Sequence, residues 1–312
     1  MLNRLVTLAM AALFSLALYT PAMAADDPEQ AAKFLQSLHF QQGTIKLPGD
    51  IATLTLPPTF RYLPPADTER LLVDGWGNPP GSTTLGMIVP AGVSPLDQAG
   101  WGAVITYDKD GHVKDDDADS IKYDELLKEM QESVIASNAE RKEKGYPAMT
   151  LLGWAERPHY DKAEHKLYWA QELRTDGTQQ SGLNYNIRVL GREGVLVLNA
   201  VAGRDQLDAV KGEMQKVTAF TNFNPGQRYT DFNASTDKVA EYGLAALVAG
   251  GVAAKLGLFG KLLALLVAFK KIILLLVAGF GSVIYKFFKR EKPPVYPIAD
   301  ADGQDKVDLT KR

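Results

Sequence analysis

The spacing of apolar residues along the middle of the chain predicts four helices. Apolar side chains recur every three or four positions in residues 28–40, 123–144 and 206–221, which is the period of one face of an α-helix. A shorter helix is predicted over residues 67–74, where an Asp-Thr start follows two proline pairs.

Shorter apolar runs, bounded by turn residues, predict a series of β-strands. Residues 44–56 are broken by Pro48-Gly49 and predict a hairpin of two short strands. Further strands are predicted over residues 85–89, 101–107, 151–160, 166–174, 183–190 and 195–202. Because these strands follow one another through turns while the helices stand apart, the pattern favours an α+β fold with an antiparallel sheet and segregated helices.

The N-terminal end of the chain has the features of a secretory signal peptide. Residues 1–24 combine a basic start at Arg4, an apolar stretch and the small-residue site Ala22-Met23-Ala24. An uncleaved membrane anchor is the alternative, for which the apolar stretch is short. Cleavage after Ala24 would export a globular domain that spans residues 25–238.

A second apolar region, residues 239–290, predicts a membrane-anchoring segment. Lysines interrupt it, and no uninterrupted apolar run reaches the roughly 20 residues that a transmembrane helix needs. One pass over residues 242–269 would place Lys270 and Lys271 at the cytoplasmic face, and a two-pass hairpin stays open. The last residues, 291–312, are polar and proline-containing, and they predict a disordered tail.

Three small residues in this region fall at helical spacing. Ala246, Gly250 and Ala254 form a line of the small-xxx-small type, which permits two helices to approach closely in lipid. A homo-oligomer formed through this line is one reading. The abundance of Gly and Ala in apolar helices is the other.

Charge and cysteine content narrow the classes of partner and site. Residues 25–238 hold 22 basic and 31 acidic residues, a formal net charge of −9, so nucleic acid is not an expected partner. The basic excess lies beside the C-terminal apolar region, where anionic lipid headgroups would attract it. The chain has no cysteine, which excludes disulfides and thiolate metal sites.

Crowded aspartates between two predicted elements suggest a divalent cation site. Asp108-x-Asp110-Gly111 partly matches a calcium-binding loop, but Asp117 stands where a bidentate Glu is expected. The candidate metal ligands are Asp108, Asp110, Asp115, Asp117 and Asp119. The alternatives are a hairpin turn at Asp110-Gly111 and a solvated acidic loop before the next helix.

A polar face on one predicted strand is the first candidate binding surface. Asn184, Asn186 and Arg188 alternate along residues 183–190 and therefore share one side of the sheet, with Arg192 just beyond. Trp154, Arg157 and Trp169 lie on neighbouring predicted strands. Guanidinium and amide groups beside aromatic rings can hold an anion or a sugar. The solvated side of a half-buried sheet is the alternative.

A loop rich in glycine and proline is the second candidate surface. Residues 75–81 contain three glycines and two prolines, and they present Trp76 and Asn78. The only histidine pair near in sequence, His159 and His165, flanks a predicted turn and is expected at the surface rather than in a zinc site.

The common catalytic and nucleotide-binding motifs are not found in the sequence, but several stretches of it resemble a known protein family. No nucleophile elbow, P-loop, zincin motif or dinucleotide fingerprint is found. The stretches that carry the resemblance are residues 76–80 (WGNPP), 101–119 (WGAVITYDKDGHVKDDDAD), 138–160 (NAERKEKGYPAMTLLGWAERPHY), 183–199 (LNYNIRVLGREGVLVLN) and 229–251 (YTDFNASTDKVAEYGLAALVAGG). On these stretches the chain resembles the DUF2167 family of bacterial membrane-anchored proteins, a resemblance that implies no known reaction.

A looser likeness concerns the fold alone. The strand run that ends in the helix over residues 206–220 is similar to the closing sheet and helix of PsbP/Mog1-like domains, and fold does not give function.

Two hypotheses about function follow from the sequence. The first is a non-enzymatic periplasmic domain, anchored in the bacterial inner membrane, that binds an envelope protein or another envelope component. The second is a metal-assisted enzyme or a small-ligand-binding module that acts on an envelope component. No organic cofactor is expected in either case.

Overall fold

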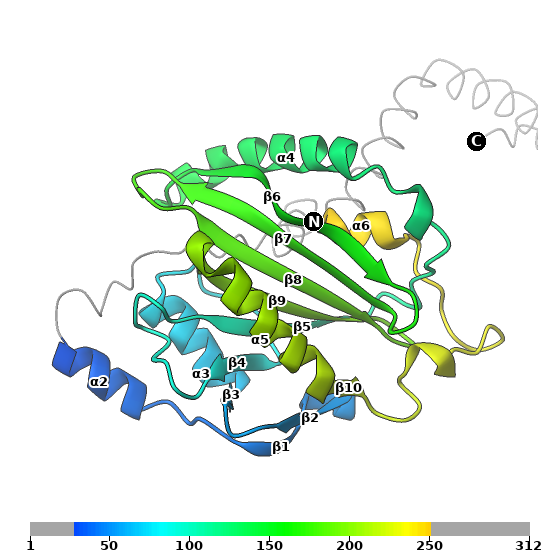
Figure 1. Cartoon of the computed structure of the whole chain (residues 1–312), viewed down its shortest axis with the longest axis horizontal. Helices are drawn as coiled ribbons and strands as arrows, with labels where there is room; N and C mark the ends of the chain where they lie inside the picture. Colours follow the sequence, from blue (N-terminus) through cyan, green and yellow to red (C-terminus); the bar gives the residue numbers. More distant parts are fainter. Residues whose placement is uncertain (1–27, 251–312) are drawn as a thin grey trace, which may run out of the picture. The chain divides into compact units, whose positions relative to one another are not determined.

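The computed structural model describes residues 28–250, and it contains two antiparallel β-sheets with helices packed against them (Figure 1). The larger sheet has seven strands in the order β3 (Phe60–Leu63), β4 (Gly86–Pro90), β5 (Gly102–Asp108), β9 (Val195–Gly203), β8 (Gly182–Leu190), β7 (Lys166–Thr175) and β6 (Met149–Asp161). The smaller sheet has the order β1 (Gly43–Lys46), β2 (Ala52–Leu56) and β10 (Thr221–Phe223). The predicted α+β class with an antiparallel sheet is confirmed.

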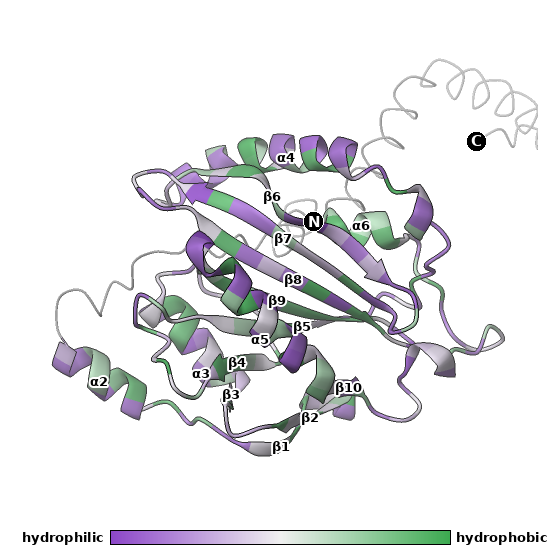
Figure 2. Cartoon of the chain, viewed as in Figure 1, coloured by the Kyte–Doolittle hydropathy of each residue, from purple (hydrophilic) through white to green (hydrophobic). Residues whose placement is uncertain are grey.

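Five α-helices belong to this part of the chain. They are α2 (Pro28–Gln36), α3 (Pro65–Arg70), α4 (Tyr123–Glu143), α5 (Leu207–Phe220) and α6 (Leu244–Val248). A π-helical turn, Leu71–Gly75, continues α3, and short 3₁₀ turns lie at Pro48–Asp50, Ala118–Ser120, Arg204–Gln206 and Tyr229–Asp231. Along α4, hydrophobic and hydrophilic residues alternate (Figure 2), and its buried residues, Met130 and Val134, lie four positions apart on one side of the helix.

One face of the seven-stranded sheet packs against α5, which crosses the front of the sheet in Figure 1. Every second residue of β8, namely Leu183, Tyr185, Ile187 and Val189, joins this core. From α5 the core receives Val210, Met214 and Val217 at helical spacing. Because side chains alternate along a strand, the residues between them on β8 must face the other side of the sheet.

The opposite face of the sheet carries two separate apolar clusters. One cluster joins Met130 and Val134 of α4 to Trp169 of β7 and to the buried side chains of α6. The other cluster lies under α3 and the π-helical turn, and it includes Leu72 and Val104. The polar side chains of β8 therefore lie between two apolar clusters.

Residues 239–250 pack into the folded body, although their apolar composition had predicted that they belong to the membrane-anchoring segment. Leu244, Leu247 and Val248 are almost fully buried. The carboxylate of Asp117 accepts hydrogen bonds from the backbone N–H groups of Leu244 (3.0 Å) and Ala245 (3.2 Å), which caps the start of α6. Apolar residues here serve a protein core rather than a lipid contact.

The small-residue line predicted in this region is not continuous. Helix α6 ends at Val248, and Gly250 has a positive φ of 94°, so Ala246 and Gly250 do not share one helix face. Ala254 lies outside the described residues.

Other predictions for the chain ends also fall outside the described range. These are the signal peptide (residues 1–24), the predicted membrane segment from residue 251 onward, and the polar tail (residues 291–312). Across residues 28–250, none of the helices combines the length and hydropathy that crossing a membrane would demand.

Candidate functional site

A cavity of about 410 Å³ lies on the sheet face opposite α5. Its floor is built from side chains of β5, β7, β8 and β9, and its walls come from α4, α6 and the loop at residues 81–84. A volume of this size is within the range of roughly 300–1,000 Å³ that is typical of small-molecule sites. The cavity occupies the polar gap between the two apolar clusters.

Arg188 is the cationic group of the cavity. Its guanidinium carbon lies 4.7 Å from the centroid of the Trp169 ring, which gives a cation–π contact. Only Nη1 donates hydrogen bonds within the described residues, to Oδ1 of Asn186 (3.4 Å) and to the carbonyl of Ile187 (3.3 Å). Both distances are longer than those of strong hydrogen bonds. The Trp169 ring and two weak hydrogen bonds therefore hold the guanidinium in place, while most of its N–H donors have no acceptor among the described residues.

No carboxylate of residues 28–250 comes within ion-pair distance of Arg188. Burial lowers the pKa of its guanidinium to about 10, although the charge of Asp108 acts in the opposite direction. Desolvation therefore outweighs the compensation that this acidic neighbour provides.

Three residues that line the cavity each carry a buried polar atom without a hydrogen-bond partner in the described part of the chain. The atoms are Nε1 of Trp169, Oγ of Ser82 and Oδ1 of Asn199. Trp169 is only 1% exposed, so its indole N–H has no access to bulk solvent. Buried polar atoms in proteins are nearly always hydrogen-bonded, so each exception needs an explanation, such as strain, a catalytic role, or a bound water or ion.

Acidic residues also belong to the lining of the cavity. Asp108 and Asp110 both contribute to its lining. The hydroxyl of Tyr242 donates to Oδ2 of Asp110 (2.8 Å), and burial raises the pKa of that phenol well above its ordinary range. The lining of the cavity thus includes one guanidinium and two carboxylates.

The predicted polar face of β8 lies in this cavity. Asn184, Asn186 and Arg188 all line it, together with Trp169 of the neighbouring strand. Asn199 of β9 also lines the cavity and was not among the residues predicted from the sequence. The available signal was a single Asn within the otherwise apolar run of Val195–Gly203. Burying a polar side chain costs free energy unless it forms hydrogen bonds, so such a residue on a buried strand points to a polar contact.

Trp154 and Arg157 lie away from the cavity, on strand β6. Arg157 forms an exposed ion pair with Asp124 of α4, in which Nη2 lies 3.1 Å from Oδ1. Trp154 packs at the edge of the α4 cluster. Register shifts in the pairing of β6 with β7 occur on either side of Trp154, so simple alternation does not predict which face these residues occupy.

Trp76 and Asn78 point into the protein rather than outward. The indole N–H of Trp76 donates to the carbonyl of Pro95 (2.9 Å), and the amide of Asn78 donates to the carbonyl of Leu72 (3.1 Å). Both residues are less than a tenth exposed. They stabilise the loop over residues 75–81 from within, and they do not offer it as a contact surface.

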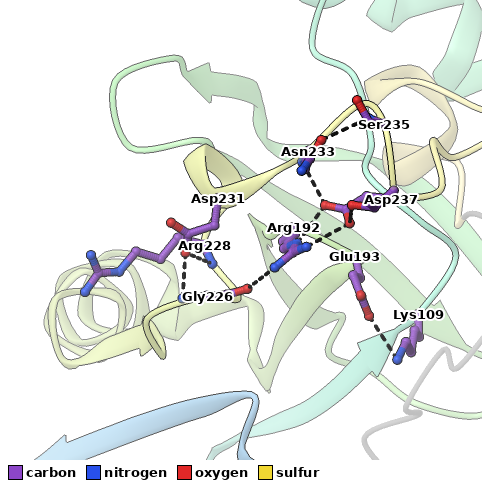
Figure 3. A network of polar contacts seen from close by, with 10 residues as sticks. Lys109, Arg192, Glu193, Gly226, Arg228, Asp231, Asn233, Ser235 and Asp237 are labelled. Atoms are coloured by element: carbon purple, nitrogen blue, oxygen red, sulfur yellow. Dashed lines mark hydrogen bonds and ion pairs between the residues drawn. The ribbon is translucent and has the colours of Figure 1, made fainter.

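Arg192 is also outside the cavity, in the polar network of Figure 3. Its Nε and Nη2 donate to the two carboxylate oxygens of Asp237 at 2.6 and 2.8 Å, and Nη1 donates to the carbonyl of Gly226 (3.2 Å). The guanidinium holds the pKa of the Asp237 carboxyl well below its usual range. This bidentate pair fastens the segment that leads from α5 to α6.

The candidate metal ligands have different structural roles and do not form one metal site within residues 28–250. Asp115 accepts hydrogen bonds from the hydroxyls of Tyr160 (2.8 Å) and Tyr229 (3.3 Å), Asp117 caps α6, and Asp119 is exposed. Within residues 28–250, no group of three or more His, Asp and Glu side chains is arranged so that it could hold a metal ion.

A stack of rings beside Asp115 was not expected from the sequence. The rings of His165, Tyr229, His112 and Phe232 lie one upon another, with successive centroid distances of 4.1, 4.2 and 3.9 Å. His112 is 6% exposed and its Nδ1 has no partner. The stack fastens the 3₁₀ turn Tyr229–Asp231 to the body.

We expect this stack to make the stability of the domain depend on pH. Burial lowers the pKa of His112 below its ordinary value of 6.5, and His165 acts in the same direction, while Asp115 and the carbonyls of Gly191 and Arg192 oppose it. Between the two pKa values the unfolded chain binds more protons than the folded protein. The stabilisation is therefore complete above pH 6.5 and is lost as the pH falls toward the folded-state pKa.

The measurement is the urea midpoint at about pH 7.5 and about pH 5.5, for the wild type and for His112→Phe. The phenylalanine keeps an aromatic ring between Tyr229 and Phe232 but cannot be protonated. Its midpoint should fall less on acidification than that of the wild type. An equal fall in both proteins would show that His112 does not carry the effect.

Comparison with solved structures finds a distant similarity to the solution structure of the cyanobacterial PsbP protein (CyanoP) from Synechocystis. The match has 11% sequence identity and a TM-score of 0.31, and it covers 60% of this chain and 93% of that one. A similarity of this extent carries no argument about function. A search among curated proteins gives no match.

The family model described as "Protein of unknown function (DUF2167)" matches residues 39–281. This range contains both sheets, every strand that lines the cavity, and helices α4, α5 and α6. The match covers well over half of the chain, so the protein belongs to the DUF2167 family.

Proposed function

We propose that the protein is a non-enzymatic binding domain of the bacterial cell envelope and that it holds a small polar molecule in the cavity of its seven-stranded sheet. The observation that carries this proposal is that one guanidinium and three residues with unpartnered buried polar atoms line a single cavity. Such atoms destabilise a protein unless something supplies their hydrogen bonds. A bound ligand would supply them.

The chemistry of the cavity supports recognition rather than catalysis. Most polar groups that face it are amides, hydroxyls, an indole N–H and a guanidinium, which position a ligand and do not exchange protons near neutral pH. Asp110 already accepts a hydrogen bond from Tyr242. The metal-assisted enzyme is less well supported, because the described aspartates do not converge.

The envelope location is part of the proposal and rests on the two chain ends. Residues 1–24 have the signal-peptide features described above, and residues beyond Gly250 continue the lysine-interrupted apolar region. We propose a periplasmic domain that this region anchors in the inner membrane. N-terminal sequencing of the protein purified from membranes, with Ala25 as the expected first residue, checks the export step.

The test of binding is a thermal-shift screen of the full-length protein against small polar compounds: neutral sugars, sugar acids, sugar phosphates and amino acids. We expect at least one class to raise the Tm of the wild type, because a ligand that binds only the folded state stabilises it. The Asn199→Leu variant should lose that response. Its own stability should be unchanged or higher, because an unpartnered buried carbonyl is replaced by an apolar group of similar size.

Asn138→Leu is the matched control. The Asn138 side chain exchanges two hydrogen bonds with the backbone of Met149, both at 2.8 Å, and it lies outside the cavity. This variant should lose about 1–3 kcal/mol of stability and keep the ligand response. If no compound shifts the wild type and Asn199→Leu is as unstable as Asn138→Leu, the cavity is a structural feature and the proposal is wrong.

A further inference from the structure

We propose that the ligand of the cavity is a small hydroxylated anion whose acidic group contacts Arg188 and whose hydroxyls contact the neighbouring amides. This inference rests on the proposed function and narrows it to one chemical class. Three properties of the cavity lead to it: the state of the guanidinium, the kind of hydrogen bond that each unpartnered atom requires, and the distribution of charge.

The guanidinium of Arg188 is the group that an acid would satisfy. It has five N–H donors, yet only Nη1 is engaged by the described residues. One face of the guanidinium is covered by the Trp169 ring. Its planar donor fork matches a carboxylate or a phosphate in a bidentate arrangement.

The unpartnered atoms require a ligand that both donates and accepts hydrogen bonds. Oδ1 of Asn199 is an acceptor and needs a donor from the ligand. Nε1 of Trp169 is a donor and needs an acceptor. A hydroxyl group can meet either need, whereas a simple fatty acid has no donor beyond its head group. The ligand is therefore a hydroxylated molecule.

The amide of Asn184 adds to this requirement. The residue is 4% exposed, it lines the cavity, and its side chain forms no hydrogen bond with the rest of the described chain. An amide carries both donors and an acceptor, which is the combination that neighbouring sugar hydroxyls use. The apolar wall from Met130, Val134 and Leu247 suits the C–H face of a sugar ring.

The charged side chains of the lining favour a ligand with a single acidic group. Arg188 is the one cationic residue among the described residues that line the cavity, and Asp108 and Asp110 also belong to the lining. A molecule of the sugar-acid or sugar-monophosphate type fits all three properties. Sugar acids and sugar monophosphates both combine one anionic group with several hydroxyls.

The experiment is calorimetric titration of the full-length protein with matched pairs of compounds. The pairs are D-glucuronate with D-glucose, D-gluconate with sorbitol, and N-acetylmuramate with N-acetylglucosamine, and D-glucose 6-phosphate is titrated as the phosphate arm. We expect at least one anion to bind ten-fold or more tightly than its neutral partner. A response to D-glucose 6-phosphate alone would identify a sugar phosphate, and a response to a carboxylate would identify a sugar acid.

Variants of Arg188 complete the test. Arg188→Gln should weaken binding of the anion at least ten-fold and leave the neutral partner unaffected, while Arg188→Lys, which keeps the charge but not the fork, should lose less. Arg157→Gln, in an exposed ion pair outside the cavity, is the control and should bind like the wild type. If Arg188→Gln does not fold, the comparison of Arg188→Lys with the control still decides.

Two outcomes would overturn the inference, and they differ in whether the proposed function survives. Equal binding of the neutral and anionic partners, unaffected by Arg188→Lys, would reject the anion and retain a polar-ligand site. No binding of any compound, together with the failure of the thermal-shift screen, would reject both proposals.

Discussion

Replacing Phe60 with alanine is expected to lower the free energy of unfolding by about 3–5 kcal/mol, because the truncation of a buried aromatic residue loses transfer free energy and leaves a cavity. Phe60 is fully buried in the core between the sheets and α5. The centroid of its ring lies 5.4 Å from that of Phe220 and 6.4 Å from that of Trp101. One substitution therefore removes contacts to α5 and to the residue that directly precedes β5. Equilibrium urea denaturation measures the loss.

Ile135→Ala is the control for this prediction. Ile135 lies on α4 and is 66% exposed, so its truncation should change stability by no more than about 0.5 kcal/mol. A loss below about 1 kcal/mol for Phe60→Ala would mean that the core under α5 is less tightly packed than described.

Replacing Gly111 with alanine should cost about 2–4 kcal/mol, through strain and through the loss of nearby backbone pairing. Gly111 has a φ of 113°, and a Cβ placed on it would lie 2.7 Å from the carbonyl oxygen of Lys238. Just beyond it, His112 exchanges two backbone hydrogen bonds of 2.8 Å with Lys238 and Ala240. The alanine would push this segment, and α6 after it, away from the body.

Gly177→Ala separates the two causes. Gly177 also has a positive φ, of 88°, but a Cβ there would meet nothing within 4 Å. It should lose only about 1 kcal/mol, from conformational strain alone. Thermal and urea denaturation of both variants give the difference. Equal losses at the two positions would show that the contact between Gly111 and residues 238–240 contributes nothing.

The sequence was sufficient for the long strands and for the polar face of β8, because both depend on local alternation. Asn184, Asn186 and Arg188 occupy every second position, and a strand places such residues on one side whatever it pairs with. The short strands β3 and β10 were not predictable in this way. Strand β10 pairs with β2, about 170 residues earlier in the chain, and three residues carry no periodicity of their own.

The cavity itself was beyond the reach of sequence periodicity. Its floor comes from strands that a pattern can identify, but its walls come from α4, α6 and residues 81–84, which only the tertiary fold brings together. The assignment of α6 to the membrane-anchoring segment has a related cause. A buried core helix and a membrane segment show the same apolar composition, and the cap from Asp117 that distinguishes them lies 127 residues before Leu244.

The position of α6 has a practical consequence for anyone who prepares the domain without its apolar C-terminal region. A recombinant fragment cut at Lys238 would lack Leu244, Leu247 and Val248, and it would expose the apolar surface of α4 and β7 that these residues cover. Such a fragment would be prone to aggregation, and its cavity would lack one wall. Fragments should therefore extend through Gly250. A failure of the shorter one to bind a ligand would reveal only that the wall is missing.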